Sequence, residues 1–496
     1  MVALPEWYEV PDQGGEHPAT LMAVLDEAPT SRFHRRAVLV SGVGFFTDAY
    51  DLFVISIVAT MVKTQWHLTT TQTSWVTGSA ILGAFIGAVV FGRLADLFGR
   101  KLVYWLVAVV MIAGALFSAI APDVVFLIGA RFVLGLGIGG DYPVSAVLMS
   151  EYANRKDRGR LVGLVFSMQA LGLVVGPIVA MTLLAGGVSH GMTWRLLLAF
   201  GALPAAGAVY LRSRMPESPR FAARVKGQSA DVVSHLERYS DVSVEASPTA
   251  HEQTSSMNLR TFFTDRRMVR LLIGTAGAWF LFDYAYYGNT LSLPAILKDV
   301  DPGATLISKL ALTLLLFVVF AVPGYLLAIA RMDRIGHRRL QLLGFSVMAL
   351  AFVALGLVGP LTEMVGPFIA VFGLSYFFIE FGPNTMTFVL PSEVFPTSVR
   401  TTGHGLAAGI GKLGAFIGVF LVPQLQSGIG LRGMLFVAGL ASIAGLFVTL
   451  LLPETNRRSL DEISGELPVV LSPSIDLVEG AENSVPPQVA ADVATL

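Results

Sequence analysis

The feature that most constrains the fold of this chain is a series of long apolar runs that recurs along most of its length. Each run has about 20 residues, enough for an α-helix to cross the roughly 30 Å hydrocarbon core of a bilayer. Inside that core the backbone must satisfy its own hydrogen bonds, which favours helices. Of the 496 residues, 54% are hydrophobic and only 14% are charged, against about 25% charged residues in soluble domains. The chain is therefore predicted to be an all-α membrane protein.

We expect twelve transmembrane helices in two groups of six. Their predicted positions are 37–62, 73–95, 102–121, 124–149, 161–186, 193–213, 270–297, 306–330, 339–359, 365–391, 402–427 and 431–452. This pattern predicts an N-terminal tail (1–36), an N-terminal six-helix bundle (37–213), a polar central loop (214–269), a C-terminal six-helix bundle (270–452) and a C-terminal tail (453–496).

Basic residues alternate between the predicted loops and set the orientation. Arg93, Arg100 and Lys101 lie in one loop, and Arg155–Arg160 lie in the second loop after it. The central loop and the segment 331–339 also carry basic residues, and they fall on the same side of the membrane in this alternation. By the positive-inside rule, both tails and the central loop are expected on the cytoplasmic side of the cell (plasma or inner) membrane.

The two halves of the sequence repeat each other. "PESPR" (Pro216–Arg220) closes the first half and "PETNR" (Pro453–Arg457) closes the second, and "GRLADLFGRK" (92–101) is answered by "ARMDRIGHRR" (330–339) at the same offset. Such duplication is typical of two bundles related by a pseudo-two-fold axis, with a substrate site between them.

The "GRLADLFGRK" segment has two readings. One is a positive-inside loop with a tight glycine turn, and the other is a cytoplasmic gate in which Asp96 pairs with basic groups in one conformation only. The segment resembles the hallmark motif of the major facilitator superfamily. The candidate gating residues are Arg93, Asp96, Arg100, Glu151, Arg158, Asp333, Glu393 and Arg400.

Several ionisable residues are predicted to lie near the bilayer midplane. At about 1.5 Å rise per residue, Asp48, Asp141, Asp283 and Lys412 all lie roughly 15–20 Å from the basic or acidic residue at the cytoplasmic end of their helix. Asp51 lies one turn beyond Asp48. A single buried charge can serve a helix-to-helix hydrogen bond, but charges facing lipid are costly, so a group of them is expected to share a wet cavity.

The charges expected in this cavity are unbalanced. Asp48, Asp51, Asp141 and Asp283, with Glu380 as a further candidate, face the single cation Lys412. Desolvation and mutual repulsion favour protonation of several of these carboxylates. The sequence therefore predicts a proton-binding site, and an anionic cargo would enter it together with protons.

Uncharged polar groups are expected near the same depth. Trp279, Asp283 and Tyr287 have the spacing of one helical stripe, which is more often packing than ligand binding. Tyr142, Gln169 and Asn384 are predicted to lie mid-span. Isolated amides in membrane helices usually bond a neighbouring helix, although Asn384 follows the helix-breaking Gly382 and Pro383.

The segments "FFTDAYDLFVISIV", "GIGGDYPVSAVLMSE", "GTAGAWFLFDYAYYGNTL" and "FGPNTMTFVLPSEVFPTSVRTTGHGLAAGIGKLGA" resemble the phosphate:proton symporters of the major facilitator superfamily. The resemblance covers about residues 37–460. It implies that inorganic phosphate and protons are the cargo, and that the protein is a monomer in the lipid bilayer. The implied phosphate-binding residues are Tyr142, Gln169, Trp279, Asp283, Tyr287 and Asn384. It assigns proton passage to Asp48, Asp51 and Asp141, and substrate affinity and coupling to Lys412. Glu380 departs from the family pattern, which more often has an amide there.

Phosphate fits these residues, because an ionised Asp283 can accept a hydrogen bond from P–OH, which sulfate lacks at neutral pH. The alternative is a proton symporter of the same fold for an aromatic or other organic acid. The excess of carboxylates argues against a sugar. A membrane enzyme, a cofactor, a metal site or a nucleic-acid partner is not expected. No cysteine is present, and no phosphate-binding loop for ATP occurs.

Overall fold

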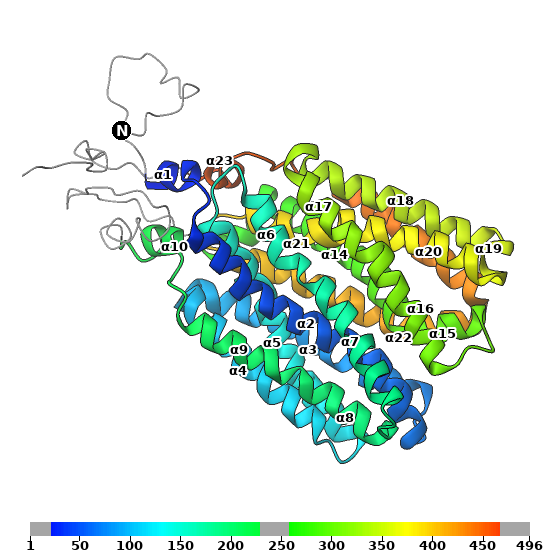
Figure 1. Ribbon diagram of the computed structural model, residues 1–496. Coiled ribbons are helices and arrows are strands. Elements are labelled where there is room, and N and C mark those ends of the chain that lie inside the picture. Colours follow the sequence, from blue (N-terminus) through cyan, green and yellow to red (C-terminus); the bar gives the residue numbers. More distant parts are fainter. Residues whose placement is uncertain (1–20, 229–256, 467–496) are drawn as a thin grey trace, which may run out of the picture.

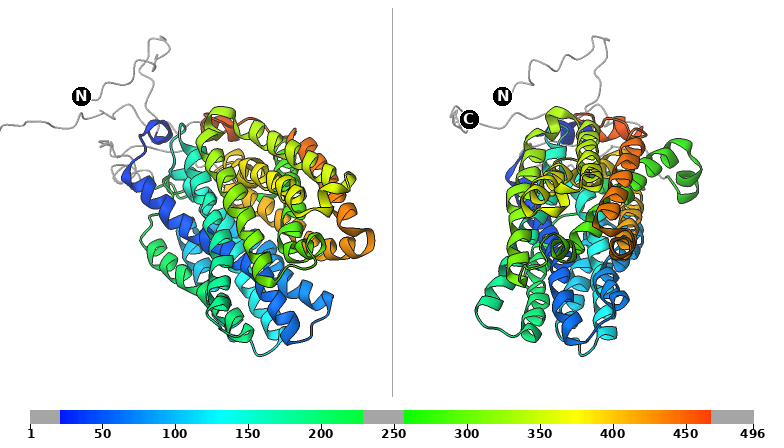
Figure 2. Two further views of the ribbon diagram at one scale, coloured as in Figure 1. Left: turned by 45° about the vertical axis from the view of Figure 1, so that its right-hand side comes forward. Right: turned by 90° about the vertical axis from the view of Figure 1, so that its right-hand side faces the viewer.

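The computed structural model describes residues 21–228 and 257–466, and every regular element within these two ranges is a helix (Figure 1). Most of both predicted tails and part of the predicted central loop lie outside the described residues. Figure 2 shows two groups of long helices side by side, formed by the first and the second half of the chain. The short helices α1 (Leu21–Glu27), α10 (Pro219–Arg224) and α23 (Leu460–Ser464) lie together at one end.

The first half contains six spans. They are α2 (Arg32–Gln65), α3 (Thr70–Phe98), α4 (Arg100–Ala119), α5 (Val124–Tyr152), α6 (Arg158–Ser167) continued by α7 (Gln169–Ala185), and α8 (His190–Phe200) continued by α9 (Ala202–Ser213). Polar side chains begin several of them, as expected for N-caps. The Thr69 hydroxyl accepts from the backbone N–H of Gln72, and the Asp123 carboxylate accepts from that of Phe126.

The second half repeats this arrangement. Its spans are α14 (Arg266–Leu291), α16 (Leu306–Leu316) continued through η1 (Phe317–Ala321) into α17 (Val322–Ile335), α18 (His337–Leu357), α20 (Val365–Ile379) continued through η2 (Glu380–Asn384) into α21 (Thr385–Val394), and α22 (Arg400–Thr449). Three short helices accompany them: α13 (Leu259–Thr264), α15 (Leu293–Val300) and α19 (Pro360–Glu363).

Twelve spans follow from these elements. Within residues 21–228 and 257–466, ten helical stretches are long and apolar enough to cross a membrane. One of them, α22, is interrupted at Gly430, whose φ of 73° and ψ of 172° are not helical, so it comprises two spans. The helix α14 is the twelfth, and it differs from the others in carrying Asp283 and several aromatic hydroxyls in its second half. The predicted all-α fold is confirmed.

The glycine of the repeated motif has a clear structural role. Gly99 separates α3 from α4 with φ of 107°, and Gly336 separates α17 from α18 with φ of 102°. Only glycine adopts this backbone conformation without strain. In each turn a glutamate accepts from the first backbone N–H of the next helix: Glu217 from Arg100 at 3.1 Å, and Glu454 from His337 at 2.8 Å.

Small residues bring the helices of each bundle close together. A Cβ on Gly135 of α5 would lie 1.9 Å from the carbonyl oxygen of Ala80 on α3, and one on Gly139 would lie 2.0 Å from that of Ala84. In the other bundle, a Cβ on Gly414 of α22 would lie 2.3 Å from the carbonyl oxygen of Phe280 on α14. Membrane helices lack a hydrophobic driving force between them, so such close contacts supply much of the packing energy.

The contact at Gly135 predicts a loss of stability in Gly135→Ala. The added methyl group has no room against the α3 backbone, and overpacking of this kind costs about 1–3 kcal/mol. We expect a lower melting temperature for the purified variant in detergent, followed by circular dichroism. Gly129→Ala on the same helix is the matched control, because a Cβ there meets nothing within 4 Å. A Gly135→Ala variant as stable as Gly129→Ala would contradict the close approach.

Candidate functional site

A buried ion pair between α14 and α22 lies at the centre of the molecule. Lys412 Nζ lies 2.9 Å from Asp283 Oδ2 and donates a hydrogen bond of 3.1 Å to the Tyr287 hydroxyl. The ammonium also lies 4.6 Å and 4.3 Å from the ring centroids of Tyr142 and Tyr287. Asp283 Oδ1 is buried and has no hydrogen-bond partner among the described residues. The Trp279 side chain is the only other hydrogen-bonding group among the described residues that interacts with this carboxylate besides Lys412, so Oδ1 can accept a hydrogen bond from a ligand.

Hydrogen bonds lead from this ion pair into the N-terminal half. The hydroxyls of Tyr287 and Tyr142 lie 3.5 Å apart, and Gln169 Nε2 donates to the Tyr142 hydroxyl at 3.2 Å. The Tyr325 hydroxyl in turn donates to Gln169 Oε1 at 3.4 Å. Because Tyr142 and Gln169 come from the first half and the other two from the second, the network joins both bundles.

The network ends at the π-helical turn η2. Asn384 Nδ2 donates to the Tyr325 hydroxyl at 2.8 Å and to Glu380 Oε2. Trp279 packs beside the network: its ring centroid lies 6.1 Å from that of Tyr142, and a Cβ on Gly411 would come within 2.6 Å of the indole. All the predicted substrate residues except Trp279 therefore belong to one hydrogen-bonded network, and Trp279 lies against it.

The chain positions these side chains by breaks and stripes in its helices. Gln169 begins α7 directly after the junction at Met168, where α6 ends. Asn384 closes the turn η2, which contains Pro383. The stripe of Trp279, Asp283 and Tyr287 on α14 faces α22, where Lys412 contacts Asp283 and Tyr287 and Gly411 provides room for the Trp279 indole. Backbone irregularities of this kind are tolerated at membrane depth where protein surrounds them.

The predicted proton-coupling residues lie within the N-terminal bundle. Asp141 Oδ2 forms a 2.7 Å ion pair with Arg212 Nη2 of α9, and its Oδ1 accepts from the Ser145 hydroxyl at 3.0 Å. The guanidinium reaches Asp141 beside Gly44 of α2, where a Cβ would lie 1.8 Å from Arg212 Nη2 and 2.6 Å from Asp141 Oδ2. Any larger residue at position 44 would displace this pair.

Asp48 and Asp51 have different surroundings. Asp48 interacts electrostatically with Asp141 and Arg212, yet neither of its buried carboxyl oxygens has a hydrogen-bond partner within the described residues. The Asp51 carboxyl points at the α8–α9 junction, where a Cβ on Gly201 would lie 2.3 Å from Oδ1. Its backbone carbonyl accepts a 2.6 Å hydrogen bond from Arg131.

The expectation of a single cation near these carboxylates is wrong. Arg212 and Arg131 are both fully buried in the N-terminal bundle, in addition to Lys412. Sequence reasoning missed both, although each lies inside a predicted span. The depth of Arg131, about 10 Å into the helix that begins at residue 124, was the signal that could have revealed it.

One end of the interface is closed by ion pairs and hydrogen bonds between the bundles. Arg400 of the second half lies 3.2 Å from Glu151 of the first half, and Arg100 also pairs with Glu151 at 3.3 Å. Asp96 accepts from the Thr402 backbone N–H and hydroxyl, both at 2.6 Å. These carboxylates and guanidiniums are buried, so they seal the interface against water.

The symmetry-related contacts complete this seal. Arg158 of the first half pairs with Glu393 of the second at 3.0 Å, which mirrors the pair of Arg400 with Glu151. His337, at the position equivalent to Arg100, lies 3.0 Å from Glu393 and 3.3 Å from Asp333. The sequence did not reveal the role of His337. Arg93 is half-buried and forms no ion pair within the described ranges, so it is the predicted gating residue that the structure leaves outside the seal.

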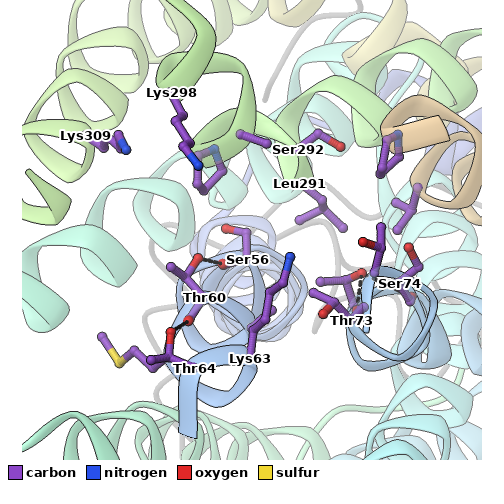
Figure 3. Close-up of a pocket in the computed structure, with 18 of the residues that line it drawn as sticks. Ser56, Thr60, Lys63, Thr64, Thr73, Ser74, Leu291, Ser292, Lys298 and Lys309 are labelled. Carbon is purple, nitrogen blue, oxygen red and sulfur yellow. Dashed lines mark hydrogen bonds between the residues drawn. The ribbon is translucent and has the colours of Figure 1, made fainter. Parts of the chain in front are cut away.

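The opposite end of the interface is open. A cavity of about 520 Å³ lies between the two halves there, lined by α2 and α3 on one side and α15, α16 and α22 on the other (Figure 3). Its basic lining residues are Lys63, His190, Lys298 and Lys309, with several serine and threonine hydroxyls, and none of the described lining residues is acidic. The cavity is therefore suited to anions. Ser56 lines it, and Phe53, one turn deeper on α2, stacks on Tyr287 at 5.3 Å.

Comparison with known sequences identifies relatives along nearly the whole chain. The family profile described as "Sugar (and other) transporter" matches residues 37–467. "Inorganic phosphate transporter 1-11" of Oryza sativa subsp. japonica is 34% identical over 510 residues, which is 91% of each chain. "Low affinity inorganic phosphate transporter 4" of Lotus japonicus is 35% identical over 505 residues, covering 90% of this chain and 94% of the relative.

Solved structures share the fold. The MFS (major facilitator superfamily) proton:xylose symporter XylE bound to 6-bromo-6-deoxy-D-glucose matches with a TM-score of 0.73 at 20% identity, over 88% of this chain and 99% of that chain. The relatives are transporters, and this chain is accordingly a multi-pass integral membrane transporter, not an enzyme. The chain belongs to the major facilitator superfamily and, within it, to the family of the inorganic phosphate transporters.

Proposed function

We propose that this transporter imports inorganic phosphate together with protons. The observation that carries the proposal is the central network, in which Lys412 binds Oδ2 of Asp283 and is joined to hydroxyl and amide groups from both bundles, while Oδ1 accepts no hydrogen bond from the described residues. The names of relatives at 34% and 35% identity support phosphate as the cargo.

Monobasic phosphate matches the donors and acceptors of this network. Tyr142, Gln169, Trp279, Tyr287 and Asn384 supply hydrogen-bond donors for its oxygens, and Lys412 supplies a positive charge. Asp283 Oδ1 accepts a hydrogen bond from a P–OH group. Sulfate carries no such proton at neutral pH, so Asp283 discriminates against it by leaving two negative oxygens in contact.

Protons enter through the Asp48, Asp51 and Asp141 group in this proposal. Asp141 is already balanced by Arg212 at 2.7 Å, whereas Asp48 has no hydrogen-bond partner among the described residues. Charges without a partner are costly at membrane depth. Asp48 is therefore the carboxyl whose proton neutralises the group, and its charge returns when the surrounding helices move and admit water.

Transport proceeds by alternating access. The state described above has the cavity side open and the side of Asp96, Glu151 and Glu393 sealed. Phosphate and protons enter from the cavity and the bundles rock about the central network. The reciprocal pairs of Arg158 with Glu393 and Arg400 with Glu151 then break to open the opposite side. The reciprocal pairing lets both halves separate by the same motion.

The orientation follows from the basic loops. We assign the sealed end, with α1, α10 and α23, to the cytoplasmic side of the cell membrane and the cavity to the outside. We also propose that the chain divides into two bundles, a central loop and two tails, as the sequence predicts. We propose that the transporter is a monomer.

Uptake of radiolabelled phosphate into proteoliposomes tests the cargo. An inward proton gradient should drive accumulation, and arsenate should compete whereas sulfate should not, because arsenate shares the acidic hydroxyl. Competition by sulfate equal to that by arsenate would contradict the role of Asp283. Competition by an aromatic acid, with no uptake of phosphate, would assign the site to organic acids instead.

Asp48→Asn should abolish gradient-driven phosphate accumulation, because the amide cannot carry the proton. It should preserve the exchange of phosphate across the membrane when the pH is equal on both sides, because the amide keeps the shape of the side chain. Both rates are measured in the same vesicles. Asp123→Asn is the matched control: it makes the same change at the N-cap of α5, outside the network, and asparagine caps helices as well as aspartate. Undiminished pH-dependent accumulation in Asp48→Asn would exclude the proposed role.

The native chain has no cysteine, so single cysteines report orientation cleanly. Thr64→Cys in the cavity should react with a membrane-impermeant maleimide added to intact cells. Lys156→Cys at the sealed end should react only after permeabilisation. The reverse pattern would show that the cavity faces the cytoplasm.

A further inference from the structure

A further buried carboxyl group lies on the C-terminal side of the network. Glu380 opens the π-helical turn η2 and is fully buried. Its Oε2 accepts from Asn384 Nδ2, and its Oε1 has no hydrogen-bond partner among the described residues. Neither the cargo site nor the Asp48 group described above uses this carboxyl.

The surroundings of Glu380 supply no positive charge. The phenols that interact with it are Tyr286 of α14, Tyr325 of α17 and Tyr376 of α20, and the amide of Asn384 comes from its own turn. From α18 the approaching residue is Gly344, which lies against Gly382 and Pro383. No ion pair of Glu380 occurs within the described part of the chain. An ionised carboxylate here would have no counter-ion, so the neutral acid is the form that this environment accommodates.

The local backbone holds Glu380 in this place. Gly324 of α17 passes so close that a Cβ there would lie 3.0 Å from the Glu380 Cβ and 2.4 Å from the Phe377 carbonyl oxygen. The widened turn frees the Glu380 carbonyl oxygen, and the Thr385 hydroxyl satisfies it at 2.7 Å. Single π-helical turns within α-helices occur frequently at functional sites.

Glu380 is connected to the cargo site through one amide. Asn384 Nδ2 donates both to Glu380 Oε2 and to the Tyr325 hydroxyl, and Tyr325 donates to Gln169. A negative charge on Glu380 would hold the Asn384 amide and lie close to an anion bound by Asn384 and Gln169. A proton on Glu380 removes that repulsion and releases the amide towards the anion.

We propose that Glu380 is a second proton-binding site of this transporter, which carries a proton while phosphate binds from the cavity side and releases it when the sealed side opens. The inference rests on the proposed function and adds one coupled proton to those carried by the Asp48 group. The proton is bound on the free Oε1, no covalent bond to the cargo forms, and water entering from the opened side accepts the proton.

The test is the number of protons transported per phosphate. Proteoliposomes are held at fixed membrane potential with an inward gradient of one pH unit, and the steady-state phosphate accumulation ratio is measured with radiolabel. Each coupled proton raises this ratio about tenfold for each pH unit. Glu380→Gln keeps the shape and polarity of the side chain. Vesicles that contain the same amount of this variant should therefore accumulate about tenfold less phosphate than vesicles with the wild-type protein. Glu363→Gln, the same change at an exposed position in α19, should match wild type.

A second variant guards against misfolding of the first. Tyr325→Phe keeps the Glu380 carboxyl and removes only the hydroxyl between Asn384 and Gln169, so an active variant should keep the wild-type accumulation ratio. An accumulation ratio equal to wild type in active Glu380→Gln overturns the inference and leaves proton-coupled phosphate import in place. A wild-type ratio that does not respond to the pH gradient would overturn both the inference and the proposed function.

Discussion

The arrangement of this protein depends on how it balances charge at membrane depth. Lys412 and Asp283 neutralise each other at the interface of the two bundles, 2.9 Å apart, and two tyrosine rings stack against the ammonium. In the N-terminal bundle, Arg212 balances Asp141. Asp48 in the first half and Glu380 in the second half are buried carboxyls that form no ion pair within the described residues. In the proposed mechanism, the groups that have a partner of opposite charge stay ionised, and the two carboxyls without one exchange protons.

The same constraint explains the asymmetry between the two ends of the molecule. At the sealed end, carboxylates and guanidiniums from both halves are paired with one another and exclude water. At the open end, the cavity lining is basic, with several hydroxyls. An anion is attracted to such a cavity, and in the proposed mechanism it meets a compensating proton at the centre. A basic entrance combined with a central site rich in carboxyls suits co-transport of an anion with protons better than transport of a neutral solute.

Much of the fold and part of the site could be predicted from the sequence. Length and hydropathy gave the spans, and counting residues from the helix ends placed Asp283 and Lys412 at one depth, where the structure brings them into contact. Arg212 could not be found this way, because it lies near the end of its helix, where a basic residue is expected on orientation grounds alone. Its contact with Asp141 depends on the crossing of α9 and α2 at Gly44, which is a tertiary property. The π-helical turn at Glu380 is likewise invisible to periodicity, since one extra residue shifts the face of the helix that follows.

The central claim is that anion and proton bind together at a charge-balanced interface. The most direct measurement is calorimetric titration of the purified protein with phosphate in buffers of different ionisation enthalpy, at an acidic pH where free phosphate is already monobasic, which counts the protons that the protein takes up on binding. The account predicts a heat that changes linearly with buffer enthalpy, corresponding to net proton uptake. Phosphate binding with the same heat in every buffer would contradict it.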